Sequence, residues 1–139
     1  MILLDTNVLS ELMKREPHAR VVAWVHKQSV MELGTTAVTE AETFYGIELL
    51  SKGRKREGLL AAAEAMFTED FAGRVFSFDS EAACNFARIA AHRRALVKPI
   101  GHVDAQIAAI TRTRGAKLAT RNVDDFANCD IDLIDPWRA

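Results

Sequence analysis

The chain opens with a short apolar run that stops on an acid. Residues 1–4 are Met, Ile, Leu and Leu, and Asp5 follows directly. The run is far shorter than the roughly 20 residues that cross a bilayer, and its composition is typical of a strand buried in a parallel sheet. The carboxyl end of such a strand delivers the next residue to the crevice where α/β folds bind their ligands. Asp5 therefore needs a helix N-terminus, a cation or a substrate to compensate its charge.

The rest of the chain alternates between short β-type segments and longer helical segments. Apolar periodicity predicts strands at 34–37, 74–78, 117–120 and 131–134, and helices at 7–13, 19–28, 39–50, 80–96 and 103–114, with an alanine-rich helix from a basic turn at 52–56 to about residue 71. Strands separated by helices, without hairpin signals, favour a three-layer α/β/α sandwich with a central, mainly parallel sheet. With 139 residues, we expect residues 1–139 to form one domain.

Charge and cysteine usage limit the class of protein. The formal net charge of −1 predicts no general attraction to polyanions, so any contact with nucleic acid must come from local basic patches. Cys84 and Cys129 are far apart, form no C-x-x-C pair and follow no secretory signal. No apolar window is long enough for a membrane helix. These features predict a protein of the reducing cytoplasm that does not enter membranes.

Acidic residues recur where a predicted strand hands over to a helix, or where a helix begins. They are Asp5, Glu42, Asp104 and the pair Asp124 and Asp125. In a parallel sheet such junctions share one edge, so the carboxylates can converge in space. Converging carboxylates repel one another unless a cation lies among them, and Mg²⁺ or Mn²⁺ prefers such oxygen ligands. This constellation predicts metal-assisted hydrolysis of a phosphate ester.

Each acid also has a purely structural interpretation. Asp5 can cap the helix that follows it, and Asp104 can complement a helix dipole. Glu42 can close a capping box with Thr39. Asp124 and Asp125 can be ordinary turn residues. Joint placement along one sheet edge favours the metal centre, because independent caps need not share an edge.

Several ordered motifs resemble those of the PIN-domain family, and more narrowly those of FitB-like, VapC-type toxin ribonucleases from bacterial toxin–antitoxin pairs. The matching segments are 2–11 (ILLDTNVLSE), 39–42 (TEAE) with 45–47 (YGI), 104–109 (DAQIAA), 118–122 (LATRN) with 125–126 (DF), and 134–137 (IDPW). Because the resemblance spans essentially the whole chain in order, it is more specific than any one motif.

The resemblance implies a metal-dependent endoribonuclease in which Asp5, Glu42 and Asp104 hold Mg²⁺ or Mn²⁺. We assign the fourth acid to Asp125, because relatives differ and some place it where this chain has Asn122. Thr6, Asn7, Thr120 and Asn122 are then candidate donors that orient the acids or a water. The resemblance also implies a cognate antitoxin that packs near the first two helices, a homodimer or toxin–antitoxin hetero-oligomer, and contact with operator DNA only through the antitoxin.

Basic residues precede the third acidic motif. Arg88, His92, Arg93, Arg94 and Lys98 lie on one predicted helix end and the loop toward Asp104, so we expect contacts with RNA phosphates from this set. A solvated helix face is the alternative for these residues. The basic cluster at 52–56 is interpreted as a solvated turn.

Other functions remain open at this level. A haloacid-dehalogenase-type phosphatase needs a second acid two residues after its nucleophile, and that position is Asn7 here. A receiver domain needs paired acids at the first strand, which this chain lacks. The alternative that is not an enzyme is a PIN-like binding module that acts only through its partner.

Overall fold

The computed structural model describes residues 1–139 and is built around a five-stranded sheet. The strand order is β3-β2-β1-β4-β5, and every neighbouring pair is parallel. The strands are β1 (Ile2–Leu4), β2 (Leu33–Thr36), β3 (Val75–Phe76), β4 (Lys117–Ala119) and β5 (Leu133–Ile134). The apolar opening run is thus a strand of a parallel sheet, as its composition predicts, and it takes the central position.

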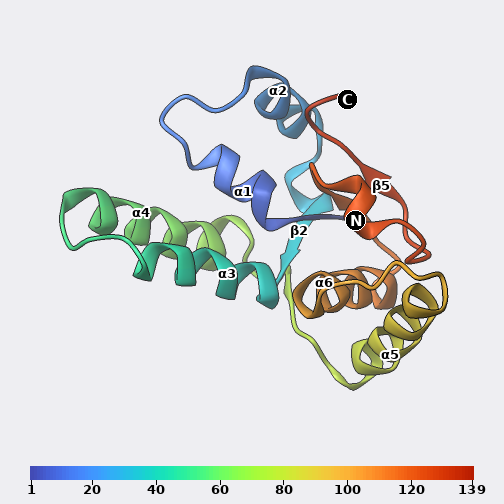
Figure 1. The fold of residues 1–139 in the computed structure, drawn as a ribbon. Helices are drawn as coiled ribbons and strands as arrows, with labels where there is room; N and C mark the ends of the chain where they lie inside the picture. Colours follow the sequence, from blue (N-terminus) through green and yellow to red (C-terminus); the bar gives the residue numbers. More distant parts are fainter.

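Six α-helices connect and cover these strands (Figure 1). They are α1 (Thr6–Leu12), α2 (Ala19–Lys27), α3 (Ala37–Glu48), α4 (Arg54–Ala65), α5 (Ser80–Ala95) and α6 (His102–Thr113). A π-helical segment, Met66–Asp70, continues α4, and two short 3-10 segments lie at Val30–Glu32 and Val123–Phe126. No helix is both long and apolar enough to span a bilayer.

The sheet separates two apolar cores. Leu3 packs with the core that α5 and α6 cover, whereas the next residue, Leu4, packs with the core under α1 to α4. Successive residues of a strand point to opposite faces, so a central strand that is apolar on both sides needs helices on both faces. The arrangement confirms the predicted three-layer α/β/α sandwich with a parallel sheet.

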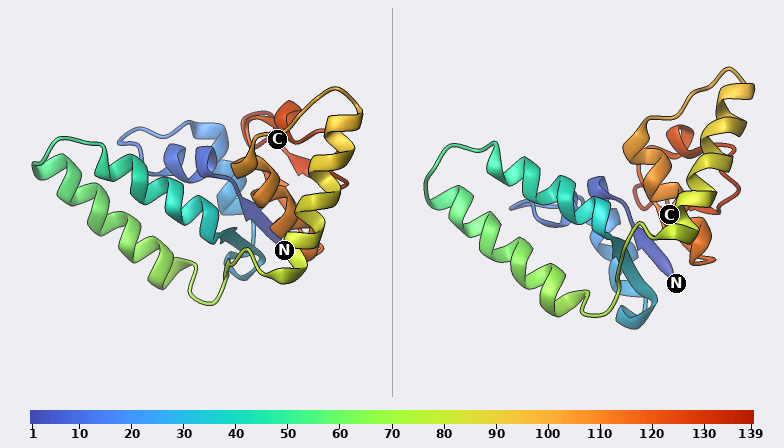
Figure 2. Two further views of the ribbon diagram at one scale, coloured as in Figure 1. Left: turned by 60° about the horizontal axis from the view of Figure 1, so that its bottom comes forward. Right: turned by 90° about the horizontal axis from the view of Figure 1, so that it is seen from below.

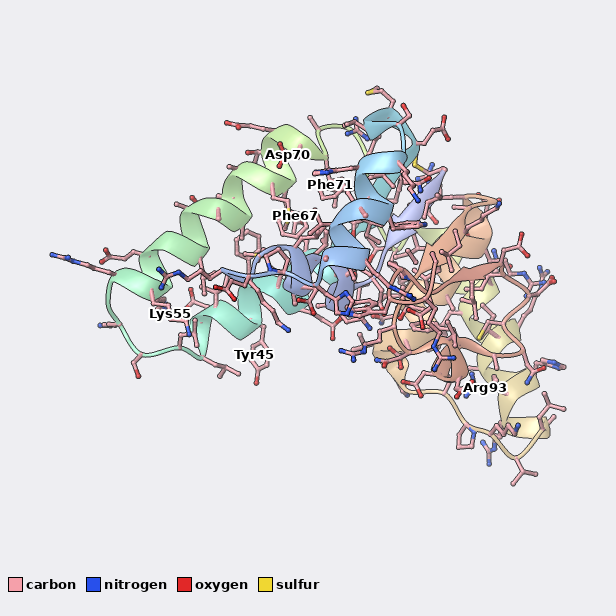
Figure 3. The ribbon with its side chains drawn as sticks, turned by 90° about the horizontal axis from the view of Figure 1, so that it is seen from above. Tyr45, Lys55, Phe67, Asp70, Phe71 and Arg93 are labelled. Atoms are coloured by element: carbon pink, nitrogen blue, oxygen red, sulfur yellow. The ribbon has the colours of Figure 1, made fainter.

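Helices α3 and α4 form a hairpin that extends beyond the sheet (Figure 2). Aromatic packing holds its two limbs together: the ring of Phe44 on α3 lies 5.6 Å from that of Phe67, and Phe67 lies 6.5 Å from Phe71 (Figure 3). The turn contains Gly53, whose φ of 154° is a conformation that side-chain-bearing residues rarely adopt. The hairpin forms one wall of the grooves described below.

Local boundaries differ from the sequence-based expectation, most clearly at the start of α3, in the two edge strands and at the start of α4. Thr36, not Thr39, caps α3: its hydroxyl accepts from the Thr39 N–H at 3.0 Å. The strands expected at 74–78 and 131–134 are only two residues long, because pairing at the sheet edges stops there. Helix α4 begins at Arg54, so most of the predicted basic turn lies in the first turn of a helix.

Candidate active site

Asp5 lies at the carboxyl end of the central strand and is only 5% exposed. Its Oδ1 accepts from the Thr6 N–H at 2.8 Å, so Asp5 does cap α1. Its Oδ2 accepts from the Thr120 hydroxyl at 2.8 Å and from the Asn7 amide at 3.4 Å. Capping therefore uses one carboxylate oxygen, while the other is held by groups from two elements that meet at this sheet edge.

Glu42 reaches the same place from the second turn of α3. Its Oε1 accepts a 2.6 Å hydrogen bond from the hydroxyl of Thr6. Because Thr36 occupies the cap of this helix, Glu42 closes no capping box with Thr39, and that structural interpretation is wrong. The hydroxyl of Thr6 also lies 3.2 Å from that of Thr39, which fixes the Thr6 side chain between α1 and α3.

Asp104 comes from the first turn of α6 and completes the group. Together with Asp5 and Glu42 it lines one open cavity of about 410 Å³. Partial burial, followed by the charges of Asp5, Asp125 and Glu42, raises the pKa of Asp104 to about 6. Burial is also the main cause that raises the pKa of Asp5, and the charges of Glu42 and Asp125 add to it. Acids distant in sequence thus converge closely enough to act on one another.

The fourth acidic position is better matched by Asp125 than by Asp124. The charge of Asp125 is among the main causes of the raised pKa of both Asp5 and Asp104, whereas the charge of Asp124 is among those of neither. Both residues are exposed and line a neighbouring cavity of about 400 Å³, which shares Arg121 and Asn122 with the acidic cavity. The assignment of Asp125 remains a prediction that this proximity supports.

The candidate donor residues form a connected network around Asp5. The amide of Asn7 donates to the Thr120 hydroxyl at 3.3 Å, and its Oδ1 accepts from the Arg121 N–H at 3.2 Å. The Asn122 N–H donates to the Thr120 hydroxyl at 3.1 Å. Thr120 is therefore the centre of the network, because it accepts two hydrogen bonds while donating its proton to Asp5.

Arg93 differs from the other residues of the basic set that the sequence suggests for RNA contact. Its side chain is buried, and its guanidinium donates to the carbonyls of Lys98 at 2.6 Å, Asp125 at 2.8 Å and Ala127 at 3.0 Å (Figure 3). The expected RNA contact of Arg93 stays a prediction that its burial does not favour, because Nε and Nη1 of its guanidinium join the end of α5 to the segment that carries Asp125.

The other members of that basic set are exposed. Arg88, His92, Arg94 and Lys98 line neither the acidic cavity nor the groove beside it. Their contact with RNA stays a prediction.

Sequence reasoning missed several residues that line the acidic cavity: Ser10, Glu11, Lys14, Arg121 and Trp137. A signal for Ser10 and Glu11 was present, because they lie three and four residues after Asn7 and so share a face of α1, and Lys14 follows just beyond the end of this helix. The guanidinium of Arg121 lies 5.1 Å from the centre of the Trp137 ring. No sequence pattern predicts that contact, which brings together the segments that follow β4 and β5.

The side chains as placed do not form a ready-made chelate. No group of three or more His, Cys, Asp or Glu residues is arranged so that it could hold a metal ion. Mg²⁺ commonly binds proteins through one or two carboxylates and keeps several waters, so this geometry is compatible with an ion held partly through water. Direct ligation by Asp5, Glu42 and Asp104 together remains a prediction.

Comparison with known proteins defines the class. The PIN domain family model matches residues 2–131, and the chain belongs to this family.

Within the family, the chain is similar to toxin proteins over its full length. It is 37% identical to VapC ribonuclease Y4jK of Sinorhizobium fredii, covering 99% of this chain and 98% of that protein. It is 36% identical to Toxin FitB of Neisseria gonorrhoeae, covering 99% of each. A solved structure of FitAB bound to an IR36 DNA fragment has a TM-score of 0.93 at 36% identity, covering 99% of this chain and 96% of that one.

Proposed function

We propose that this protein is the toxin of a type II toxin–antitoxin pair and acts as a Mg²⁺- or Mn²⁺-dependent endoribonuclease. The observation that carries the proposal is the convergence of Asp5, Glu42 and Asp104 in one cavity, from a strand end and two helices. The full-length similarity to a VapC ribonuclease and to a FitB toxin supports the choice of RNA over other phosphate esters.

The donor set fits a hard divalent cation. Burial is the main cause of the raised pKa values of Asp5 and Asp104, and repulsion from the neighbouring acids adds to it. Arg93 acts on Asp104 in the opposite direction, but its guanidinium is committed to backbone carbonyls. A cation in the cavity relieves this repulsion and favours the charged carboxylates. When bound, it supplies the charge that activates a water and offsets charge developing on the phosphodiester.

The protein's own residues orient the acids for this reaction. Thr6 fixes one oxygen of Glu42, and Thr120 fixes one oxygen of Asp5, so both carboxylates present defined faces to the cavity. Lys14 and Arg121 line the same cavity and provide positive charge for the phosphate of a substrate. Hydrolysis then adds a water oxygen to phosphorus and breaks the P–O bond to the leaving nucleotide, whose oxygen takes up a proton.

The partner assignment rests on the relatives. We propose that a cognate antitoxin binds this chain and that the assembly is a homodimer or a toxin–antitoxin hetero-oligomer in the cytoplasm. We also propose that operator DNA is contacted through the antitoxin, since the similar FitAB structure contains a DNA fragment.

The family model ends at residue 131, and we propose that residues 132–139, with β5 and Trp137, complete the same domain.

Cleavage of RNA by purified protein tests the function. The antitoxin-free protein should cleave single-stranded RNA with added Mg²⁺ or Mn²⁺, and EDTA should stop cleavage. Asp5→Asn and Asp104→Asn should each lower the rate by about 100-fold or more, in the range seen when one group that stabilises transition-state charge is removed. Asp132→Asn, an exposed acid outside the cavity, is the matched control.

Three outcomes would contradict the proposal. Cleavage at the wild-type rate by both site variants would place the chemistry elsewhere. Absence of RNA cleavage together with hydrolysis of p-nitrophenyl phosphate would make the protein a phosphatase, and absence of both activities would leave a PIN-like binding module.

A further inference from the structure

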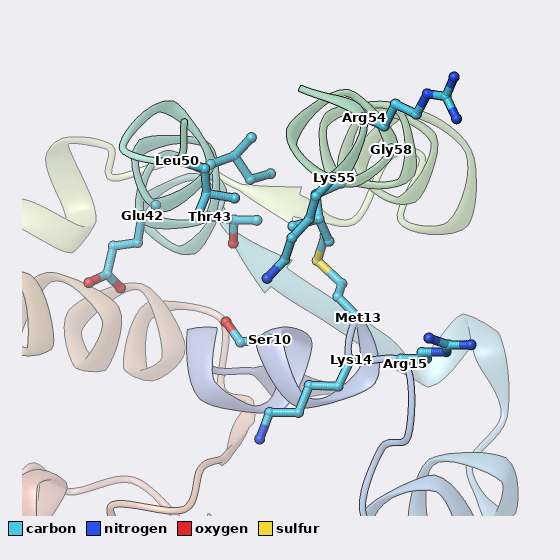
Figure 4. A pocket seen from close by; sticks show the side chains of 13 residues that line it. Ser10, Met13, Lys14, Arg15, Glu42, Thr43, Leu50, Arg54, Lys55 and Gly58 are labelled. Carbon is cyan, nitrogen blue, oxygen red and sulfur yellow. The ribbon is translucent and has the colours of Figure 1, made fainter. Parts of the chain in front are cut away.

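A second and larger cavity adjoins the acidic one. It is a groove of about 850 Å³ between α1 on one side and the α3–α4 hairpin on the other (Figure 4). Ser10, Lys14 and Glu42 line both this groove and the acidic cavity. The groove therefore leads away from the acids along the hairpin, and we call it the hairpin groove.

The walls of the hairpin groove are basic. Lys14, Arg15, Arg54 and Lys55 line it, and Glu42 at its acidic end is the only carboxylate among the lining residues. Arg15, Arg54 and Lys55 form no salt bridge, whereas Lys14 lies 3.1 Å from Glu11. Uncompensated cations on facing walls, in a chain of net charge −1, create a local positive field that favours an anionic polymer.

The cations are distributed along the groove. Figure 4 shows Lys55 reaching from α4 into the space toward Met13, while Arg54 and Arg15 extend outward at the end away from Glu42. The hairpin wall has open space at Gly46 and Gly58, where an added Cβ would meet nothing within 4 Å. The result is an open channel with positive charge from its rim to the acids.

We propose that the hairpin groove binds the sugar–phosphate backbone of single-stranded RNA on one side of the scissile phosphate. The inference rests on the proposed ribonuclease function and extends it to a substrate path. Proteins that bind single strands without reading sequence use a positive groove that follows the backbone. No aromatic side chain lines this groove, so it offers phosphate contacts rather than base stacking. An acidic polypeptide also matches the charge, but the continuity with the acidic cavity favours the molecule that is cleaved there.

The binding of fluorescein-labelled, unstructured single-stranded RNA in EDTA tests this path. All proteins carry Asp104→Asn to prevent cleavage, and anisotropy gives Kd between about 50 and 200 mM salt. Arg15→Gln with Lys55→Gln removes one cation from each wall of the groove. Arg88→Gln with Arg94→Gln removes two exposed cations of α5, the other RNA contacts that the sequence predicts, and tests that alternative path. All four positions are exposed, and none forms a salt bridge.

We expect the groove pair to weaken RNA binding more than the α5 pair does. A lost phosphate contact on a single strand lowers the salt slope by about 0.7, which corresponds to about 5-fold in Kd at 0.1 M salt, so the groove pair should raise Kd about 25-fold. An unchanged Kd for the groove pair overturns the proposal and leaves the groove to a polypeptide partner. A larger loss from the α5 pair also overturns it and places the path on α5.

Cleavage by proteins with an intact Asp104 separates this inference from the proposed function. Wild-type protein that cleaves RNA, together with a groove pair that cleaves and binds normally, rejects only the path. A wild-type protein that cleaves no RNA rejects the function itself.

Discussion

The acidic cavity and the hairpin groove hold charge in opposite ways. In the cavity, Asp5 is buried, fixed by hydrogen bonds from Thr6, Asn7 and Thr120, and repelled by neighbouring acids. In the groove, Arg15, Arg54 and Lys55 are exposed and form no salt bridge. Burying a charge such as that of Asp5 lowers stability unless neighbouring groups donate hydrogen bonds to it. The exposed cations of the groove cost little, because water solvates each of them.

Arg93 shows the same contrast among cations. It lies behind the acidic cavity, buried and bonded to three carbonyls, while its neighbour Arg94 is exposed. We infer that the buried charge of Arg93 is needed for a stable fold. The exposed charges along the groove, in contrast, can change without affecting folding.

The largest expected effect is on Arg93. Arg93→Met leaves the carbonyls of Lys98, Asp125 and Ala127 without their side-chain donor, and should lower the free energy of unfolding by about 3 kcal/mol. Urea denaturation measures this change. Arg94→Met, the exposed control, should change it by less than about 0.5 kcal/mol. Equal effects of the two variants would remove the distinction between fixed and free cations.

Thr120→Val should have the next largest effect. The valine side chain keeps the shape but removes the donor to Asp5 and the acceptor for Asn7 and Asn122, at a cost of about 2 kcal/mol. Thr111→Val is the control: that threonine is equally buried, but its hydroxyl serves a helix carbonyl of Ile107, and the loss should stay below about 1 kcal/mol. A neutral Thr120→Val would mean that the network does not hold Asp5.

Asp104→Asn should stabilise the metal-free protein in a pH-dependent way. Since the pKa of Asp104 is raised to about 6 in the folded state, the folded protein binds more protons than the unfolded chain between about pH 4 and 6, and stability from this group falls as the pH rises. Asparagine does not titrate, so the stability of the variant does not fall with pH at this position. Allowing for solvent screening at a half-buried site, it should gain about 1 kcal/mol relative to wild type by pH 7 and almost nothing at pH 4.

Denaturation in EDTA across this pH range measures the difference, with Asp132→Asn as a control that should follow wild type. A gain independent of pH would show that repulsion among the acids is not its cause.

The smallest expected effect lies in the hairpin groove. Gly58 is exposed in the interior of α4, and an added Cβ meets no atom, so Gly58→Ala should raise the free energy of unfolding by about 0.5 to 1 kcal/mol through helix propensity alone. Thermal denaturation measures the gain, and RNA affinity should not change, because one methyl group leaves the channel open. Destabilisation would show that the groove wall is less tolerant than its exposure indicates.

Much of the fold follows from local patterns in the chain. The apolar run that ends on Asp5, the helical spacing of Phe44 and Ile47, and the absence of hairpin signals predict a parallel sheet with helices on both faces. The least accurate predictions were at the edges: β3 and β5 are two residues long, and the cap of α3 lies at Thr36. The length of an edge strand depends on the backbone of its only neighbouring strand. The position of a helix cap depends on where the chain turns out of the preceding strand. Residue type alone therefore fixes neither.

For the site, the sequence by itself determined which acids follow strands or begin helices. It therefore also determined that Asp5, Glu42 and Asp104 share one edge of a parallel sheet. Only the tertiary structure decided the surroundings of that edge. It placed Thr6 and Thr120 on the carboxylates, buried Arg93 and set the hairpin cations beside α1. The physical reason is that strand direction and helix period are local properties, whereas burial and contact depend on which distant segments pack together.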